Sequence, residues 1–320
     1  MALQGFICAH NKTNQSFEFC LAVCGQCDEL PFFYAITKDL RDVKKSVFST
    51  TEILKPQLQV QLQRTQPYFL SPEDLTIAAF GSAFHMLISH GQEDLHNAGF
   101  EEYEFESKLH FEETLITDFG PVTLTGTPDQ YNFNTNVLVD YKTLKYFYDG
   151  RALREGKIKE QSSLRKHMYQ TNIYRRQKFP DCKKIRLFAL YKDYNNRLKK
   201  EGIPPYELHD VPIMPDPEVD ILVSSRLNLH MAAEQGAPCP PCSPDERYYQ
   251  PDSDLSLACI FYCSVREICP VRSEFVTIGA DGLPVIPEDT YKPKAPVVRT
   301  KGGKNAKTVR KPGPGVSKKV

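Results

Sequence analysis

The sequence predicts an α/β fold in which a mixed central sheet is flanked by helices. Segments rich in β-branched and aromatic residues alternate with period two through the middle of the chain, and amphipathic segments with helical period precede and follow them. Their order is helix, antiparallel strands, helix, strand, strand, helix, which favours an α/β core with a mixed sheet. The first thirty residues are rich in cysteine, and we expect them to be irregular.

The element boundaries follow from periodicity and from capping residues. Ser49 and Thr50 can cap one helix, and Ser71 can cap another that has Pro72 at its first position. The expected helices are Pro31–Val43, Glu52–Gln63, Pro72–Ser89, Arg151–Gln177 and Pro217–Gln235. The expected strands are Tyr103–Phe111, Glu113–Ile116, Val122–Thr127, Val137–Tyr141, Lys184–Leu190 and Leu208–Ile213.

The charge is distributed unevenly along the chain. The 40 basic and 40 acidic residues cancel, but ten of the basic residues and none of the acidic ones lie between Tyr291 and Val320. This Lys-, Gly- and Pro-rich tail has too few apolar residues to form a core, so we expect it to be disordered. It could bind polyanions or serve only for solubility.

No apolar stretch reaches the ~20 residues of a membrane helix, and the amino terminus lacks the pattern of a signal peptide. We therefore expect a cytoplasmic protein without a membrane segment. Ten cysteines are many for a reducing compartment, and they are clustered, which favours metal binding.

An acidic centre is predicted where two strands meet. Asp129 ends the segment Gly126-Thr-Pro-Asp129, and Asp140 and Lys142 follow the apolar run Val137-Leu-Val139. A hairpin would bring the two aspartates side by side, and Asp140 and Lys142 would project from the same face of their strand. Mg²⁺ typically takes one or two protein carboxylates and supports phosphodiester hydrolysis. If the Asp140-x-Lys142 pattern stood alone, a surface ion pair on an edge strand would be a simpler interpretation than a metal site.

Four motifs in order resemble the PD-(D/E)xK nuclease superfamily, specifically the RecB-like branch that includes CRISPR-associated exonucleases. They are Gly81-x-x-x-His85, Gly126-Thr-Pro-Asp129, Asp140-Tyr141-Lys142 and Gln170-x-x-x-Tyr174. The resemblance spans about residues 47 to 270 and implies a restriction-endonuclease-like core.

The resemblance also implies roles for these residues. His85, Asp129, Asp140 and the backbone carbonyl of Tyr141 would ligate a catalytic Mg²⁺ or Mn²⁺, and Lys142 would orient the attacking water. Gln170 and Tyr174 would contact DNA or the carboxylates. Without the resemblance, His85 would be read as a core histidine, and Gln170 and Tyr174 as ordinary positions on an amphipathic helix. Glu112 and Glu113 could join the centre, although a solvated strand edge is the simpler reading.

Nine of the cysteines form two groups, while Cys182 fits a buried free thiol. The groups are Cys8, Cys20, Cys24 and Cys27, with His10 nearby, and Cys239, Cys242, Cys259, Cys263 and Cys269. Four thiolates suit Zn²⁺ or an iron–sulfur cluster, and spacing alone does not choose between them.

The RecB-like relatives hold a [4Fe–4S] cluster through one upstream cysteine and a Cys-x2-Cys-x5-Cys-Pro run. The run Cys259 to Pro270 resembles it with one extra residue in the first gap, and the upstream position falls near Pro56, which cannot be a ligand. We prefer a zinc site at Cys8, Cys20, Cys24 and Cys27, and an iron–sulfur cluster or a second zinc at Cys242, Cys259, Cys263 and Cys269.

The sequence therefore predicts a metal-dependent DNA nuclease that acts on single-stranded or frayed DNA ends. No Gly-x4-Gly-Lys-Ser/Thr loop is present, so unwinding would need a helicase partner. The alternative is a non-catalytic, metal-stapled nucleic-acid-binding subunit, and a recombination, CRISPR or phage DNA-processing assembly would suit either.

Four regions are expected along the chain. They are a Cys-rich segment at 1–46, the nuclease core at 47–235, a second Cys-rich metal-binding segment at 236–275 and the basic tail at 276–320.

Overall fold

The structure is a computed structural model that describes residues 3–8, 11–24, 43–100, 103–104, 109–250 and 255–277. The chain divides into two units, Met1–Val285 and Ile286–Val320. The second unit, and with it nearly all of the expected basic tail, lies outside the described residues, as does the expected helix Pro31–Val43 apart from its last residue.

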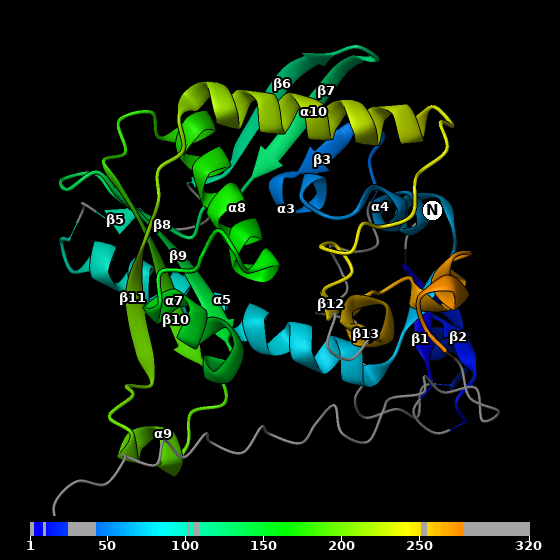
Figure 1. The fold of residues 1–320 in the computed structure, drawn as a ribbon, viewed down its shortest axis with the longest axis horizontal. Helices are drawn as coiled ribbons and strands as arrows, with labels where there is room; N and C mark the ends of the chain where they lie inside the picture. Colours follow the sequence, from blue (N-terminus) through cyan, green and yellow to red (C-terminus); the bar gives the residue numbers. More distant parts are fainter. Residues whose placement is uncertain are drawn as a thin grey trace, which may run out of the picture. The chain divides into compact units, whose positions relative to one another are not determined.

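The strands and helices of the first unit are arranged as Figure 1 shows. The strands are β1 (Leu3–Ile7), β2 (Asn14–Ser16), β3 (Val47–Ser49), β4 (Tyr68–Leu70), β5 (Tyr103–Glu104), β6 (Phe111–Thr117), β7 (Gly120–Gly126), β8 (Gln130–Asn132), β9 (Val137–Leu144), β10 (Lys184–Tyr191), β11 (Tyr206–Val211), β12 (Tyr249–Gln250) and β13 (Leu255–Ser256). The α-helices are α1 (Phe17–Phe19), α3 (Thr50–Ile53), α4 (Gln57–Thr65), α5 (Pro72–Asn97), α7 (Arg151–Arg154), α8 (Ser162–Lys178), α9 (Asn196–Lys200) and α10 (Asp216–Glu234).

A five-stranded sheet in the order β11-β10-β9-β8-β5 contains the predicted acidic strand. β9 pairs in parallel with β10 and antiparallel with β8, while β10 pairs antiparallel with β11. Two further three-stranded sheets, β3-β7-β6 and β2-β1-β4, are also mixed. The predicted α/β class with a mixed central sheet is therefore confirmed.

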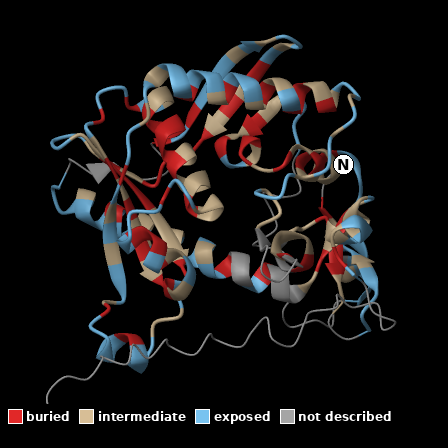
Figure 2. Ribbon diagram, viewed as in Figure 1, coloured by how far each residue is buried: buried red, intermediate tan, exposed pale blue. Residues whose placement is uncertain are grey.

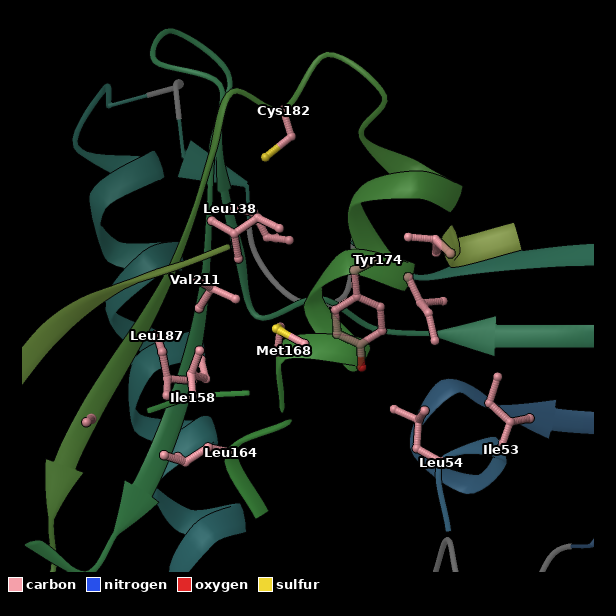
Figure 3. Close-up of a cluster of buried hydrophobic side chains, with 14 of the residues drawn as sticks. Ile53, Leu54, Leu138, Ile158, Leu164, Met168, Tyr174, Cys182, Leu187 and Val211 are labelled. Carbon is pink, nitrogen blue, oxygen red and sulfur yellow. The ribbon is translucent and has the colours of Figure 1, made fainter. Parts of the chain in front are cut away.

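Helices cover both faces of the five-stranded sheet. On one face, Phe84 of α5 meets Tyr141 of β9 and Phe188 of β10, with ring centroids 6.2 and 6.3 Å apart. On the other face, Met168 and Leu164 of α8 face Leu138 and Leu187 of the sheet (Figure 3), and all four are buried in the main core. The sheet is thus sandwiched between α5 and α8.

Helix α10 packs with an amphipathic face toward this core. Its buried residues include Val219, Val223 and Leu227, spaced four apart, whereas Ile221 and Leu229 are exposed. Buried and exposed colours accordingly alternate along the helix in Figure 2. This pattern is the one expected for a helix with one side in the core.

Buried Arg64 joins α3, α4 and α10. Its guanidinium donates to Glu52 Oε1 at 2.8 Å and to Glu234 Oε1 at 2.6 Å, and it lies 3.9 Å from the centroid of the Phe48 ring. A buried charge is stable only when it is paired in this way. Glu52 also completes a capping box with Ser49, which confirms Ser49 as the cap of the helix that starts at Thr50.

Three expectations about the elements need correction. The expected helix Glu52–Gln63 is two helices, α3 and α4, because Pro56 interrupts it. The expected helix Arg151–Gln177 is α7 and α8, separated at Gly156, whose φ of 71° does not fit a helix. The first thirty residues are not simply irregular, since β1 and β2 form an antiparallel pair and β1 lies parallel to β4.

A second, smaller core joins segments from both Cys-rich regions. Its buried residues are Leu3, Phe6, Tyr68, Leu70, Leu75 and Val265. Cys20 and Cys263 both pack against it. The amino-terminal strands and the segment around Cys263 are therefore held together by apolar packing.

Gly126 should be intolerant of a side chain, whereas Gly91 should not. A Cβ on Gly126 would lie 2.5 Å from Phe111 Cε1 and 2.8 Å from Tyr174 Cε1, while a Cβ on Gly91 meets nothing within 4 Å. We expect Gly126→Ala to lower the free energy of unfolding by about 1–3 kcal/mol. The matched change Gly91→Ala, inside α5, should raise it by about 0.5–1 kcal/mol. Urea denaturation measures both, and equal effects would contradict the packing described for Gly126.

Candidate active site

The hairpin of β8 and β9 brings the two predicted aspartates together. Gln130 pairs with Val139, so Asp129, which directly precedes β8, lies opposite Asp140. Asp129 Oδ2 accepts a hydrogen bond of 2.7 Å from the backbone N–H of Tyr141. This bond fixes the Asp129 carboxylate against β9, one residue beyond Asp140.

Lys142 lies between the two carboxylates. Its Nζ is 2.8 Å from Asp140 Oδ2 and 3.8 Å from Asp129 Oδ2, and it donates to the Tyr141 carbonyl at 3.3 Å. Asp140 is 1% exposed and Asp129 7% exposed. The expected same-face placement of Asp140 and Lys142 is thus seen, and the three charged groups form a buried cluster.

Burial and mutual attraction set the protonation of this cluster. Burial raises the pKa of Asp140 to about 7, against the opposing effect of the Lys142 ammonium. Burial would also raise the pKa of Asp129, but Lys142 and the hydrogen bond from His85 outweigh it, so this pKa is lowered. Burial acts to lower the pKa of Lys142, yet the two carboxylates raise it overall. Lys142 therefore stays an ammonium, and Asp140 is the carboxyl that titrates near neutrality.

Helix α5 supplies His85 to the cluster. His85 Nδ1 lies 3.2 Å from Asp129 Oδ1, and this hydrogen bond raises the pKa of His85. Two turns further along, buried Gln92 donates to the Asp129 carbonyl at 3.1 Å. Gln92 escaped the sequence reasoning, although its spacing of seven from His85 places it on the same helix face.

Helix α8 places Gln170 and Tyr174 at the cluster from the other side. Gln170 Nε2 donates to the Tyr174 hydroxyl at 2.8 Å. Burial and then the neighbouring Asp140 raise the pKa of Tyr174, which places this phenol close to the carboxylate. Its ring packs against Gly126 at the start of the Gly-Thr-Pro-Asp motif.

His167 is a further neighbour that sequence reasoning missed. Burial and, after it, the Lys142 ammonium lower the pKa of His167 to about 3, so the imidazole is neutral. The signal was available, because His167, Gln170 and Tyr174 follow spacings of three and four on one helix face. By contrast, Glu112 and Glu113 are exposed on β6 and do not join the cluster.

The cluster suits a divalent cation with few protein ligands. Asp140 Oδ1 is buried and has no hydrogen-bond partner in the part of the chain that the structure describes, and Asp140 Oδ2 lies 2.8 Å from Lys142 Nζ. A buried carboxylate oxygen without a donor is a favourable ligand for a hard cation, and Mg²⁺ commonly takes one or two carboxylates and keeps several waters. At this cluster and in the rest of the described residues, no three or more His, Cys, Asp or Glu side chains are grouped so that they could hold a metal ion.

The carboxy-terminal cysteines lie near one another. Burial raises the pKa of Cys242 to about 12, and the neighbouring Cys263, Cys259 and Cys269 contribute to the rise. Burial likewise raises the pKa of Cys259 to about 11, with contributions from Cys263 and Cys269. The four thiols of the predicted site are therefore neighbours, and whether they hold a metal stays a prediction.

The amino-terminal cysteines are only partly described. Cys8 directly follows β1, and its N–H donates to the Thr13 carbonyl at 2.8 Å. Cys20 and Cys24 begin and end a short π-helical turn. Cys27 and His10 lie outside the described residues, so the predicted four-thiol zinc site stays a prediction. Cys182 is a buried free thiol, as expected.

Comparison with known proteins identifies no family. No family model matches the sequence, and no curated protein matches it. One solved structure, titled "Crystal structure of SSO0001", aligns with a TM-score of 0.47 and 14% sequence identity over 77% of this chain and 98% of that chain. A similarity at this level assigns neither fold nor activity. None of the helices in the described part of the chain has the length and apolar character that crossing a bilayer requires.

Cation binding at the cluster should strengthen as the pH rises toward 7. Below about pH 7 the buried Asp140 holds a proton that a cation must displace, and above it the carboxylate is already ionised. Each pH unit below 7 should therefore weaken Mn²⁺ binding by up to about tenfold. Calorimetric titration with MnCl₂ between pH 5.5 and 8.5 measures this, and Asp140→Asn, which removes a proposed ligand together with its proton, should weaken binding at every pH. Affinity that is equal at pH 6 and pH 8 would contradict the assignment of this proton to Asp140.

Proposed function

We propose that the chain is a metal-dependent DNA nuclease that hydrolyses phosphodiester bonds. The observation that carries the proposal is the buried convergence of Asp129, Asp140 and Lys142, with Asp140 Oδ1 unpartnered among the described residues. Replacing a buried ion cluster by apolar residues is often neutral or stabilising. Stability alone is thus a poor explanation for burying these three charged residues. A reaction that needs them explains their burial better.

We further propose a restriction-endonuclease-like core of the RecB-like kind. Support comes from the elements on which the four motifs lie. Gly81 and His85 are on α5, which packs on one side of β9, and Gln170 and Tyr174 are on α8 on the other side. The Gly126-Thr-Pro-Asp129 motif runs from the end of β7 to the start of β8, and Asp140 and Lys142 are on β9. Residues far apart in sequence thereby surround one point, as the resemblance of the sequence implies.

The residues can be given separate tasks. Asp129 and Asp140, with the Tyr141 carbonyl and His85, would hold a Mg²⁺ or Mn²⁺. When bound, this cation supplies charge neutralisation for the phosphate and lowers the pKa of water. Lys142, which stays an ammonium, can donate to an anionic phosphate oxygen or orient the attacking water. Tyr174 and Gln170 can donate hydrogen bonds to the substrate or position the carboxylates.

Cleavage should require each member of the charged cluster. Asp129→Asn, Asp140→Asn and Lys142→Met should each reduce cleavage by about 10³-fold or more, because groups that act as a unit fail together. The assay incubates purified protein with end-labelled single-stranded and duplex DNA in Mg²⁺, Mn²⁺ or EDTA.

The control for this test is Asp210→Asn. Asp210 lies on β11 of the same sheet and pairs with Lys184, but its side chain is 67% exposed and it lies outside the cluster. It should retain full activity. Full cleavage by the Asp140→Asn protein would reject the site. DNA binding without cleavage by the unaltered chain would favour the alternative, a non-catalytic nucleic-acid-binding subunit.

We also propose that Cys242, Cys259, Cys263 and Cys269 hold an iron–sulfur cluster or Zn²⁺. Cys263→Ser or Cys269→Ser should then remove the metal and lower the melting temperature, because the free energy of metal binding is also folding free energy. Metal analysis and absorbance near 400 nm distinguish iron–sulfur from zinc. Cys182→Ala is the matched control and should keep the metal content unchanged. A folded, purified protein with neither metal would end the proposal.

A further inference from the structure

A pocket of about 280 Å³ lies beside the candidate active site, and the function proposed above gives its two lysines no task. Its walls come from three segments that are distant in sequence. The α3–α4 region contributes Lys55, α8 contributes Lys166 and Gln170, and the carboxy-terminal Cys-rich segment contributes Tyr248 and Cys263. This volume is just below the usual range of about 300–1,000 Å³ for small-molecule sites, so it can take one small group rather than a length of strand.

The pocket holds two cations without acidic partners. Neither Lys55 nor Lys166 forms an ion pair in the part of the chain that the structure describes. Other basic residues of α8 do, since Arg165 pairs with Asp245, and Arg176 pairs with Asp220 at 2.9 Å. The one carboxylate in the wall, Glu246, is already engaged, with Arg226 at 3.3 Å and with the Ser243 N–H at 3.0 Å. Burial lowers the pKa of Lys55, against the opposing effect of Glu52, so an anion bound in the pocket would stabilise the ammonium form of this lysine.

Tyr248 is held in an unusual conformation at this pocket. Its φ is 52°, in the left-handed region that non-glycine residues rarely adopt. Its hydroxyl accepts a hydrogen bond of 3.0 Å from Lys166 Nζ, which also lies 4.7 Å from the centre of its ring. Strained backbone of this kind is often kept at ligand clamps. The strain here places an aromatic ring and its hydroxyl beside the ammonium.

The pocket also reaches the catalytic cluster. Gln170 lines the pocket and donates to Tyr174, which lies near Asp140. His167 also lines the pocket, and the charges of Lys142 and Asp129 are close enough to affect its pKa. A group bound in the pocket would thus sit one side chain away from the proposed point of cleavage.

We propose that this pocket binds the terminal phosphate monoester of a DNA strand, with Lys55 and Lys166 as its recognition residues. A phosphate monoester carries a charge of about −1.5 to −2 at pH 7. Two ammonium groups match that charge better than they match the single charge of an internal phosphodiester. This inference rests on the proposed function, because it makes the pocket the site that selects strand ends for the neighbouring cluster.

Binding of three labelled oligonucleotides of one sequence tests the proposal. One carries a 5′-phosphate, one a 3′-phosphate and one no terminal phosphate, and all are titrated against the Asp140→Asn protein, in which cleavage is suppressed. One phosphorylated form should bind about tenfold or more tightly than the unphosphorylated one, as expected for a charge-assisted hydrogen bond. The phosphorylated oligonucleotide that binds more tightly shows whether the 5′ or the 3′ end of the strand is recognised.

The variants Lys55→Gln and Lys166→Gln, alone and together, should remove this preference while they change the binding of the unphosphorylated strand less. Lys55→Arg should keep it. Lys199→Gln with Lys200→Gln, two exposed positions on α9, is the control for the loss of two charges. Equal binding of the three oligonucleotides, or a preference that survives in the double pocket variant, would overturn the proposal. If the double variant does not fold, the comparison of the three oligonucleotides decides alone.

Cleavage by the unaltered chain, measured in parallel, separates this proposal from the proposed function. A phosphate preference without cleavage would reject the nuclease and keep the pocket. Cleavage without a phosphate preference would keep the nuclease and reject the pocket.

Discussion

The pairing register of β8 with β9 is the constraint on which the rest of the site depends. Because Gln130 lies opposite Val139, Asp129 reaches the backbone of Tyr141 and stands beside Asp140. A slip of one residue would turn Asp140 and Lys142 toward the face that α5 covers with Phe84. The parallel pairing of β9 with β10 over its whole length prevents that slip from the other side.

The register alone does not account for a stable charged cluster in the interior. Two buried carboxylates repel each other, and the Lys142 ammonium between them offsets this repulsion. His85 and the Tyr141 N–H supply further donors to Asp129, whereas Lys142 is the one donor that the described residues offer to Asp140. The cluster is therefore asymmetric. Each oxygen of Asp129 has a donor, whereas Asp140 keeps an oxygen that no donor among the described residues reaches and that a cation could use.

Local sequence patterns predicted the hairpin, β9 and the long helices, because period, caps and turn residues are local signals. They also placed Asp129, Asp140 and Lys142 together. They could not predict the pairing of β1 with β4, whose partners are far apart in sequence, nor the Lys55 pocket, which three distant segments build. Pro56 and Gly156 are residues that commonly interrupt helices. The amphipathic pattern continues across both of them, so the sequence predicted one helix where the structure has two. His167 and Gln92 were missed because only the fold shows which face of each helix meets the aspartates.

The small core shared by β1, β4 and Val265 has a consequence for how the chain is made. During synthesis Leu3 and Phe6 leave the ribosome long before their partners Tyr68 and Leu70, and Val265 follows only after the whole five-stranded sheet has been translated. This core therefore cannot close cotranslationally until very late. Its apolar residues stay available to chaperones in the meantime, and any metal bound by the cysteines beside it would be loaded on a chain whose main core has already formed.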